Sequence, residues 1–368
     1  MTPLFEIIAR RIESAGPMTL AEYMRLALTH PELGYYTAGD PLGAPRSDGS
    51  GGDFVTAPEV SQMFGELLGL WCADTWRFLG QPKPVKLIEL GPGRGTLMAD
   101  ALRAVKIVPG FAENLEVHLV ELSPALRRKQ EAALAGQAVS WHPRLDEIPE
   151  GPFLLLANEL FDALPIRQFA RGADGWRERL VTLAEDGGEL IFVLGPESEA
   201  AGLLIPEDRR DLPPGSIVEL CPDGELLARE IGRRCAAGPG AALIVDYGSA
   251  SPGGAPSFQA LRRHQRHPPL QDPGSADLTA HVDFGALARA ATAGGGQVHG
   301  PLAQGGFLLA LGLEHRAEAL RRGASESQRR EIDAAVERLT VPEAMGELFK
   351  VMAVMPPRAL PPAGFSSD

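Results

Sequence analysis

The sequence is short of the features that mark several protein classes. It has only three cysteines, Cys72, Cys221 and Cys235, which are far apart and form no C-x-x-C pair. This number and spacing predict neither a disulfide framework nor a zinc site, so we expect buried thiols and no bound metal. No apolar run is long enough for a membrane span, and residues 1–11 lack the apolar centre of a secretory signal. We therefore expect a cytoplasmic protein without a membrane span.

Basic residues are also scarce relative to acidic ones. The 35 Lys and Arg residues oppose 48 Asp and Glu residues, which gives a formal net charge of -13. Excess negative charge repels nucleic-acid phosphates, so we expect no nucleic-acid partner. An acidic surface favours a basic protein partner, although it also serves solubility. The 368 residues suffice for a large core, and they leave the oligomeric state open.

A glycine-rich stretch follows the clearest predicted strand. Residues 85–90 run apolar into Gly91, Gly93 and Gly95, and apolar residues then recur at helical spacing from Leu97. This pattern predicts a strand, a tight turn and a helix, which form the first βα unit of a doubly wound fold. Ligands in such folds bind outside the carboxyl ends of the strands, so this turn is the expected floor of a site.

The spacing of the glycines narrows the choice of ligand. Thr96 stands where a dinucleotide fingerprint needs its third glycine, and the lysine of a phosphate-binding P-loop is missing. The pattern E-x-G-x-G-x-G resembles motif I of class I S-adenosyl-L-methionine (SAM)-dependent methyltransferases. That resemblance implies that the three glycines and Thr96 hold the methionine part of SAM. A glycine turn that only packs a strand on a helix is the alternative.

The next predicted strand, residues 115–122, ends in an acid. A carboxylate at a strand tip can accept hydrogen bonds from both ribose hydroxyls of an adenosine. We therefore predict that Glu121 and its neighbour Leu122 bind the nucleoside. Ser123 and Pro124 are typical of the start of a helix. The alternative is that Glu121 is a solvated strand end.

A segment that would cover the site begins at Thr56. Thr56 and Glu59 have the T-x-x-E spacing of a capping box, with Pro58 in the first turn. We predict that a long amphipathic helix follows, with its N-terminus close to the carboxylate of the cofactor. Its buried stripe is expected to hold Met63, Phe64, Leu67, Leu68, Trp71 and Phe78. An ordinary capped helix fits the same residues.

Polar residues crowd the end of the apolar strand at residues 153–157. Asn158, Glu159 and Asp162 follow it, and methyl transfer needs groups that orient the acceptor and take its proton. We predict that Asn158 contacts the cofactor and that Glu159 and Asp162 are catalytic. Two close carboxylates suit a guanidinium, whose donors pair with carboxylate oxygens. The segment lacks the N-P-P-Y pattern of enzymes that methylate nucleic-acid bases.

The remaining patterns predict an α/β fold with a class I methyltransferase (Rossmann-like) sheet. We expect an N-terminal helical segment and lid loop at 1–80, with a mobile loop at 38–53, and a methyltransferase core at 81–368. The core carries insertions at about 166–215, which includes an antiparallel β-hairpin, and at about 249–280. Residues 249–277 suggest an irregular loop, and 306–311 and 350–355 suggest late strands. A helical addition is expected at about 313–345.

Motifs spread over the chain resemble the MidA-like methyltransferases, which include the mitochondrial respiratory complex I assembly enzyme. These motifs lie at residues 52–66, 89–96, 120–123, 158–165, 246–248, 277–284, 304–309 and 345–350. The resemblance implies SAM as cofactor and, for the mitochondrial member, symmetric dimethylation of an arginine on a complex I core subunit. Within these motifs we predict substrate contacts at Asp53, Asp246, Tyr247 and His281, although His281 fits a structural role equally well. Residues 249–271 depart from the family pattern, so the acceptor can differ.

The leading hypothesis is therefore a SAM-dependent protein methyltransferase that acts on an accessible arginine of a protein partner, a complex I-type subunit among the candidates. Two alternatives stay open. One is a binding or assembly factor that keeps the cofactor pocket but acts by holding its partner. The other is a methyltransferase of small molecules.

Overall fold

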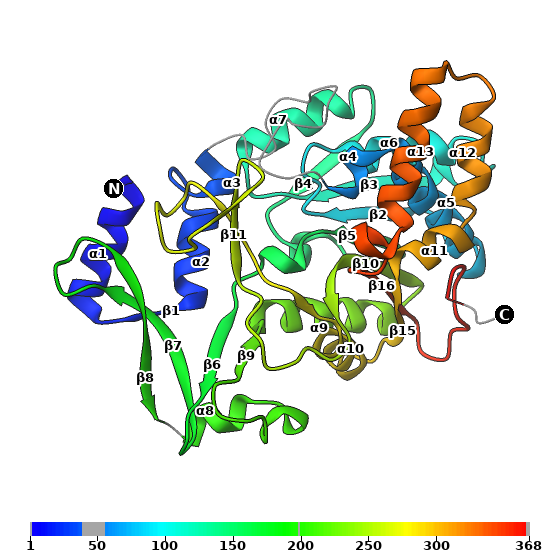
Figure 1. Ribbon diagram of the computed structural model, residues 1–368. Helices are drawn as coiled ribbons and strands as arrows, with labels where there is room; N and C mark the ends of the chain where they lie inside the picture. The colour runs from blue at the N-terminus through cyan, green and yellow to red at the C-terminus, as the bar shows by residue number, and fades with distance from the viewer. Residues whose placement is uncertain (1, 39–55, 198, 366–368) are drawn as a thin grey trace.

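An eight-stranded sheet forms the centre of the computed structural model, which describes residues 2–38, 56–197 and 199–365 (Figure 1). Five strands are parallel, in the order β4-β3-β2-β5-β10, and β16 pairs antiparallel with β10 and with β15. Their bounds are β2 Val85–Leu90, β3 Leu115–Val120, β4 Val139–His142, β5 Phe153–Asn158, β10 Gly240–Ser249, β15 Gln297–Ala303 and β16 Phe349–Met355; β14, Val282–Asp283, pairs with the end of β10. The chain leaves β2 in one direction to β3 and returns to β5 on its other side. The switch point of this doubly wound sheet therefore lies between β2 and β5.

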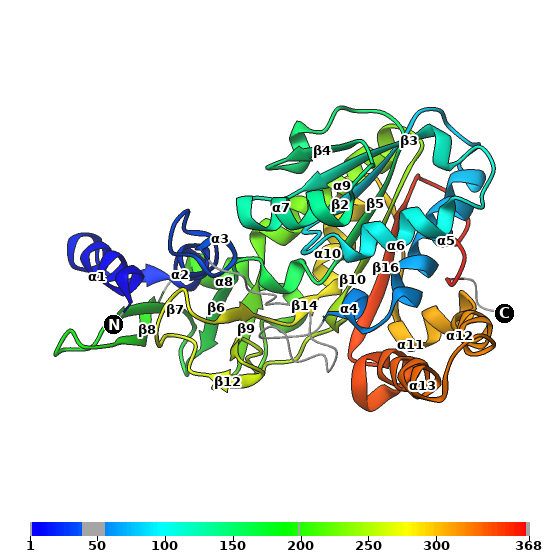
Figure 2. The same cartoon turned by 90° about the horizontal axis from the view of Figure 1, so that it is seen from above.

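Helices cover both faces of this sheet (Figure 2). One face packs against α5 (Gln62–Phe78) and α6 (Thr96–Val105), and its core continues into α11 (Gln304–Ala310), α12 (Leu313–Arg321) and α13 (Glu326–Thr340). The other face packs against α9 (Pro222–Ala237) and α10 (Phe284–Ala293). Leu87 belongs to the first core and Ile88 to the second, because successive side chains of a strand point to opposite faces.

A third core lies where the N-terminal helices meet a smaller antiparallel sheet. The helices are α1 (Pro3–Ala15), α2 (Leu20–Thr29) and α3 (Tyr35–Ala38). The sheet consists of β1 (Met18–Thr19), β6 (Arg167–Arg171), β7 (Trp176–Leu183), β8 (Leu190–Glu197) and β9 (Ile217–Leu220), with α8 (Glu199–Leu204) after β8. The predicted segment 1–80 therefore divides between two cores, because α5 packs on the main sheet.

The predicted long amphipathic helix is observed as α5 with most of its predicted buried stripe, but it begins at Gln62 and not directly after Thr56. A single turn, α4 (Ala57–Val60), ends at Ser61, and α5 starts with the Ser61 hydroxyl accepting the Met63 N–H at 3.2 Å. The Thr56 side chain makes no capping bond, so the T-x-x-E spacing does not form a capping box. Phe78, predicted on the buried stripe, is exposed.

Two late predictions also need correction, and one late strand was not predicted. Residues 306–311 form part of helix α11 rather than a strand, and strand β15 was not predicted. Within the predicted irregular loop, β11 (Gln259–Arg262) and β12 (Gln265–His267) form a hairpin, and β13 (Asp277–Thr279) pairs with β11. The hairpin predicted at 166–193, the strand at 350–355 and the helical pair are observed.

Among the described residues, no helix combines the length and apolarity needed to cross a membrane. The same residues contain no group of three or more His, Cys, Asp or Glu side chains arranged to hold a metal ion. The predicted mobile loop and Asp53 lie outside the described part of the chain.

Candidate functional site

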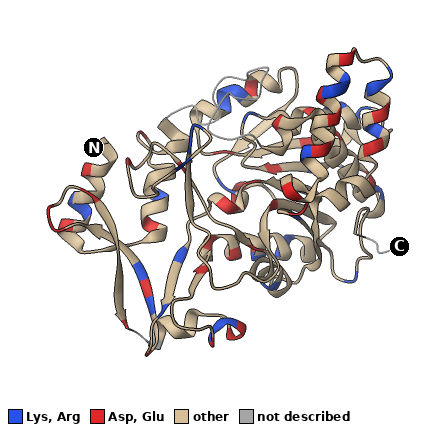
Figure 3. Cartoon of the chain, in the orientation of Figure 1, with Lys and Arg blue, Asp and Glu red and all other residues tan. Residues whose placement is uncertain are grey.

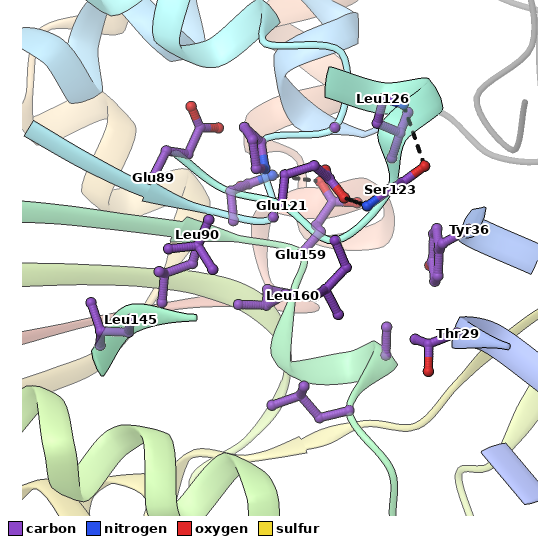
Figure 4. Close-up of a pocket in the computed structure, with 18 of the residues that line it drawn as sticks. Thr29, Tyr36, Glu89, Leu90, Glu121, Ser123, Leu126, Leu145, Glu159 and Leu160 are labelled. Atoms are coloured by element: carbon purple, nitrogen blue, oxygen red, sulfur yellow. Dashed lines mark hydrogen bonds between the residues drawn. The ribbon is translucent and has the colours of Figure 1, made fainter. Parts of the chain in front are cut away.

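A cavity of about 640 Å³ opens at the carboxyl ends of β2, β3, β4 and β5 (Figure 4). Its floor is the glycine turn after β2, and further walls come from the segments after β3, β4 and β5. Helix α4 and the N-terminal segment close it, the latter with Leu28, Thr29, Tyr36 and Thr37. This is the position in which doubly wound sheets bind ligands.

The glycine turn exposes backbone to the cavity. Gly91 and Gly93 line it with positive φ values of 63° and 54°, and a Cβ on Gly91 would stand 2.9 Å from Leu160 Cδ1. Thr96 also lines the cavity. Gly95 does not; it is the N-cap of α6, with φ 83°, and faces α7 (Pro124–Ala133). Gly95 was predicted to contact the ligand, but in the structure its positive φ serves the turn itself.

Glu121 lies in the cavity wall at the end of β3 beside the exposed Leu122. Its Oε1 accepts the Ser123 N–H at 2.7 Å, and its Oε2 accepts from Gln130 Nε2 at 3.0 Å. Burial raises the pKa of this carboxyl, and the bonds from Ser123 and Gln130 oppose that rise. A carboxylate has about four acceptor positions, so both oxygens keep capacity for a diol.

Glu59 makes tertiary contacts in place of the predicted capping contact. One oxygen accepts from the Thr96 hydroxyl at 2.6 Å, and the other lies 3.1 Å from Arg94 Nη1. Thr56, Pro58 and Glu59 all line the cavity, as does Arg94. A positive and a negative group thus stand side by side above the glycine turn, an arrangement suited to an amino-acid zwitterion.

Glu159 follows β5 with the left-handed φ of 50°, unusual for a residue other than glycine. Its Oε1 accepts the Ala57 N–H at 2.8 Å and Asn158 Nδ2 at 3.2 Å, so α4 holds the carboxylate in the cavity wall. Burial raises the pKa of Glu159 to about 7. Within the described chain Asn158 Oδ1 is buried without a hydrogen-bond partner, and Asn158 also lines the cavity. Such an acceptor is available to a ligand.

Asp162 and Asp246 lie behind this wall, which corrects two predicted contacts. Asp246 is fully buried, and its Oδ2 accepts the N–H groups of Leu160, Phe161 and Asp162 at 2.9–3.2 Å. It therefore shapes the segment that carries Glu159 and does not touch a substrate. Burial, with the negative charge of Glu159, raises the pKa of Asp162 to about 7. Neither aspartate lines the cavity.

Tyr247 and His281 are also outside the cavity. The Tyr247 ring packs edge-on against His281, with centroids 5.4 Å apart, and against Phe349. His281 is exposed and borders a separate small hollow. The structure thus places these two predicted substrate contacts outside the cavity that Glu159 lines.

Several lining residues were not predicted. Leu145 and Asp146 follow β4, and the strand-end rule applied to that strand would have found them. Tyr36 lines the cavity from α3, and its hydroxyl donates to Asp277 Oδ1 at 2.7 Å. No local motif marks it. Gln130, which does not line the cavity but bonds to Glu121 and Gly93, was also missed. It interrupts the apolar spacing of Leu126 and Leu134, which is a signal for a buried polar role.

Comparisons with known proteins agree on one family. The model of the Methyltransf_28 family, whose description is that of an S-adenosyl-L-methionine-dependent methyltransferase, matches residues 67–302. The mitochondrial protein arginine methyltransferase NDUFAF7 of Danio rerio is 39% identical over 95% of this chain and 86% of its own. The Homo sapiens protein of the same name is 37% identical over 98% and 85%. A solved structure from Burkholderia thailandensis, bound to S-adenosyl-homocysteine, is 30% identical, has a TM-score of 0.82 and covers 99% of this chain and 92% of its own.

The expected cytoplasmic location is contradicted, because the names of the Danio rerio and Homo sapiens relatives both carry the word mitochondrial. The amino-acid composition and the lack of an apolar signal bear on how the chain folds. They do not specify the compartment that holds it.

The residues of the cavity fit an adenosyl-methionine compound. The cavity is lined by the bare backbone of Gly91 and Gly93, by Glu121 with its free acceptor capacity, and by the Asn158 oxygen that has no hydrogen-bond partner among the described residues. The volume of about 640 Å³ lies in the range of small-molecule sites.

Proposed function

Since the chain belongs to this family of SAM-dependent methyltransferases and SAM is its cofactor, we propose that it methylates an arginine side chain of a protein. The observation that carries the proposal is the Glu159 carboxylate, held in the cavity wall by the Ala57 N–H next to the glycine turn. A guanidinium is always charged and offers five donors in a plane, which matches carboxylate oxygens. The name of the relatives, protein arginine methyltransferase, supports the same acceptor.

We propose the following division of the cavity. Gly91, Gly93 and Thr96 bind the methionine part of SAM, with Thr56, Pro58, Glu59 and Asn158 around it, and Glu121 and Leu122 bind the nucleoside. Bound SAM supplies an electrophilic methyl group. Arg94 joins the methionine end, because its ion pair with Glu59 provides partners for both charges of an amino acid.

Glu159 is proposed to bind the guanidinium and to accept the proton that methylation releases. A pKa of about 7 lets one carboxyl group hold a cation when ionised and take a proton afterwards. Asp162 stands behind Glu159 and adds negative charge. Asp246 acts indirectly, through the three N–H groups that it holds.

We further propose that the acceptor is a subunit of a complex I-type assembly. The resemblance to the MidA-like family supports this, and so does the acidic chain, whose net charge of -13 attracts a basic segment. Cavity walls supplied by α2, α3 and α4 would enclose such a segment at Glu159.

The test is transfer of labelled methyl from SAM to proteins of a cell lysate, followed by mass spectrometry of the labelled residue. We expect methylarginine with the wild-type chain and none with Glu159→Gln, which keeps the shape but loses the charge. Maturation of the partner by Glu159→Gln without methyl transfer would instead establish the assembly factor. Labelling of small molecules alone would establish the third hypothesis.

A further inference from the structure

Gln130 on α7 is a fully buried polar residue, and its amide forms bonds to three parts of the fold. Nε2 donates to the Gly93 carbonyl at 2.8 Å and to Glu121 Oε2 at 3.0 Å. Oε1 accepts from Trp141 Nε1 on β4 at 2.9 Å. One side chain therefore links the glycine turn, the acid after β3 and the edge strand of the sheet.

These bonds fix the direction of the Glu121 carboxylate. The Ser123 N–H holds one oxygen and Gln130 holds the other, so the group cannot rotate without breaking a bond. A carboxylate has about four acceptor positions, so the bonds from Ser123, Gln130 and the Leu122 backbone leave acceptor capacity for a ribose hydroxyl. The backbone of Glu121 is held as well, because Arg127 donates twice to its carbonyl, at 2.9 and 2.6 Å.

The same bonds favour the charged form of Glu121. Burial raises the pKa of this carboxyl, and the hydrogen bond from Gln130 lowers it. A donor with no charge of its own is suitable here, since it stabilises the carboxylate without neutralising it. Gln130 itself does not line the cavity, so it has no direct contact with a ligand there.

We propose that Gln130 is a positioning residue for the nucleoside end of the cofactor. It orients the Glu121 carboxylate toward the ribose hydroxyls and holds the Gly93 carbonyl in the turn. Trp141 fixes Gln130 in turn by occupying its amide oxygen. The inference rests on the proposed function only in taking SAM as the occupant of the cavity.

The test compares Gln130→Met, of similar length but without donors, with the wild type and with Glu131→Gln, an exposed site on the same helix. Calorimetric titration of the full chain with S-adenosyl-homocysteine gives the dissociation constant from pH 6 to 9. We expect Gln130→Met to bind about 10- to 100-fold more weakly than the wild type at pH 7, as for other indirect ligand supports. Glu131→Gln should match the wild type throughout. In methyl transfer, the KM for SAM should rise and kcat should stay nearly constant.

Equal affinity of Gln130→Met and wild type at every pH would overturn the inference. So would a fall in kcat as large as the rise in the KM for SAM, which marks Gln130 as a packing residue. If Gln130→Met does not fold, Trp141→Phe is measured in its place, because it removes the indole N–H that donates to Gln130. The same two results would then overturn the inference. A wild-type chain that binds S-adenosyl-homocysteine but methylates no arginine would contradict the proposed acceptor and leave this inference standing.

Discussion

Buried carboxylates are the residues on which the account depends most. Burial raises the pKa of Glu89, Glu121, Glu159 and Asp162. Protein interiors rarely retain acids at such a cost unless they serve a site, and three of these four line the cavity. The predictions at this scale follow from their protonation.

The rate of methyl transfer should rise with pH through about 7. Only ionised Glu159 holds a guanidinium, and its pKa is about 7, so the rate at saturating SAM should increase about tenfold from pH 6 to 8 and then level off. Glu159→Gln should lower kcat by about 10²- to 10⁴-fold and remove the pH step. A pH profile of kcat checks both. An unchanged profile in Glu159→Gln would show that another group titrates.

Glu121→Ala should abolish most cofactor binding while the fold is retained. The change removes two charge-assisted hydrogen bonds to the ribose, so affinity for S-adenosyl-homocysteine should fall by about 10²- to 10³-fold. Calorimetry measures the affinity, and circular dichroism reports the fold. Glu131→Ala, on the exposed face of α7, serves as the control. Wild-type affinity in Glu121→Ala would place the nucleoside elsewhere.

Glu89 should make the chain less stable as the pH rises. Its carboxyl is buried at the end of β2, one oxygen has no partner within the described residues, and its pKa is raised to about 8. The folded state therefore binds a proton that the unfolded state releases near pH 4.5. The stabilising effect of that proton is complete below pH 4.5 and is lost as the pH rises to about 8.

Glu89→Gln should accordingly gain stability over the wild type as the pH increases from 5 to 8. One proton changes the free energy of unfolding by at most ~1.4 kcal/mol per pH unit. Urea denaturation at several pH values measures the difference between the two chains. A constant difference would mean that Glu89 is ionised in the folded protein.

At the scale of helices and strands, regular patterns were predicted well and tertiary contacts were not. The strands β2, β3, β5 and β10 form where apolar runs end in polar residues. Residues 306–311 were predicted as a strand but lie in or directly after helix α11, because a short apolar run fits a buried helix equally well. Strand β15 escaped prediction because Gly300 and Pro301 interrupt it.

Close helix packing gives a prediction at this scale. A Cβ on Gly232 of α9 would stand 2.0 Å from the Ala291 carbonyl oxygen of α10, whereas a Cβ on Gly306 of α11 would meet nothing within 4 Å. Gly232→Ala should destabilise the chain by ~1–3 kcal/mol, since backbone must move. Gly306→Ala should be neutral or stabilise by up to ~1 kcal/mol, because alanine favours a helix. Denaturant unfolding compares them, and equal effects would contradict the packing of α9 on α10.

For the whole molecule, the N-terminal segment and the sheet together make the cavity. Tyr36 lines it from α3, and the Ala57 N–H that holds Glu159 comes from α4. Charges of both signs are interspersed over the chain, most densely on the α12–α13 pair (Figure 3).

The sequence placed the glycine turn, Glu121 and Glu159 at one edge of the sheet because all three follow strand ends. It misassigned Asp246, because a strand-end acid can turn inward to bind N–H groups, as this one does with Leu160 and Phe161. Tyr36 could not be found, since only the tertiary fold brings it to the cavity.

One measurement tests the central claim most directly: mass spectrometry of proteins labelled with methyl from SAM, using wild-type and Glu159→Gln chains that bind S-adenosyl-homocysteine equally. The account predicts methylated arginine with the wild type and at most a trace with the variant. Labelled arginine at equal levels from both chains would contradict it.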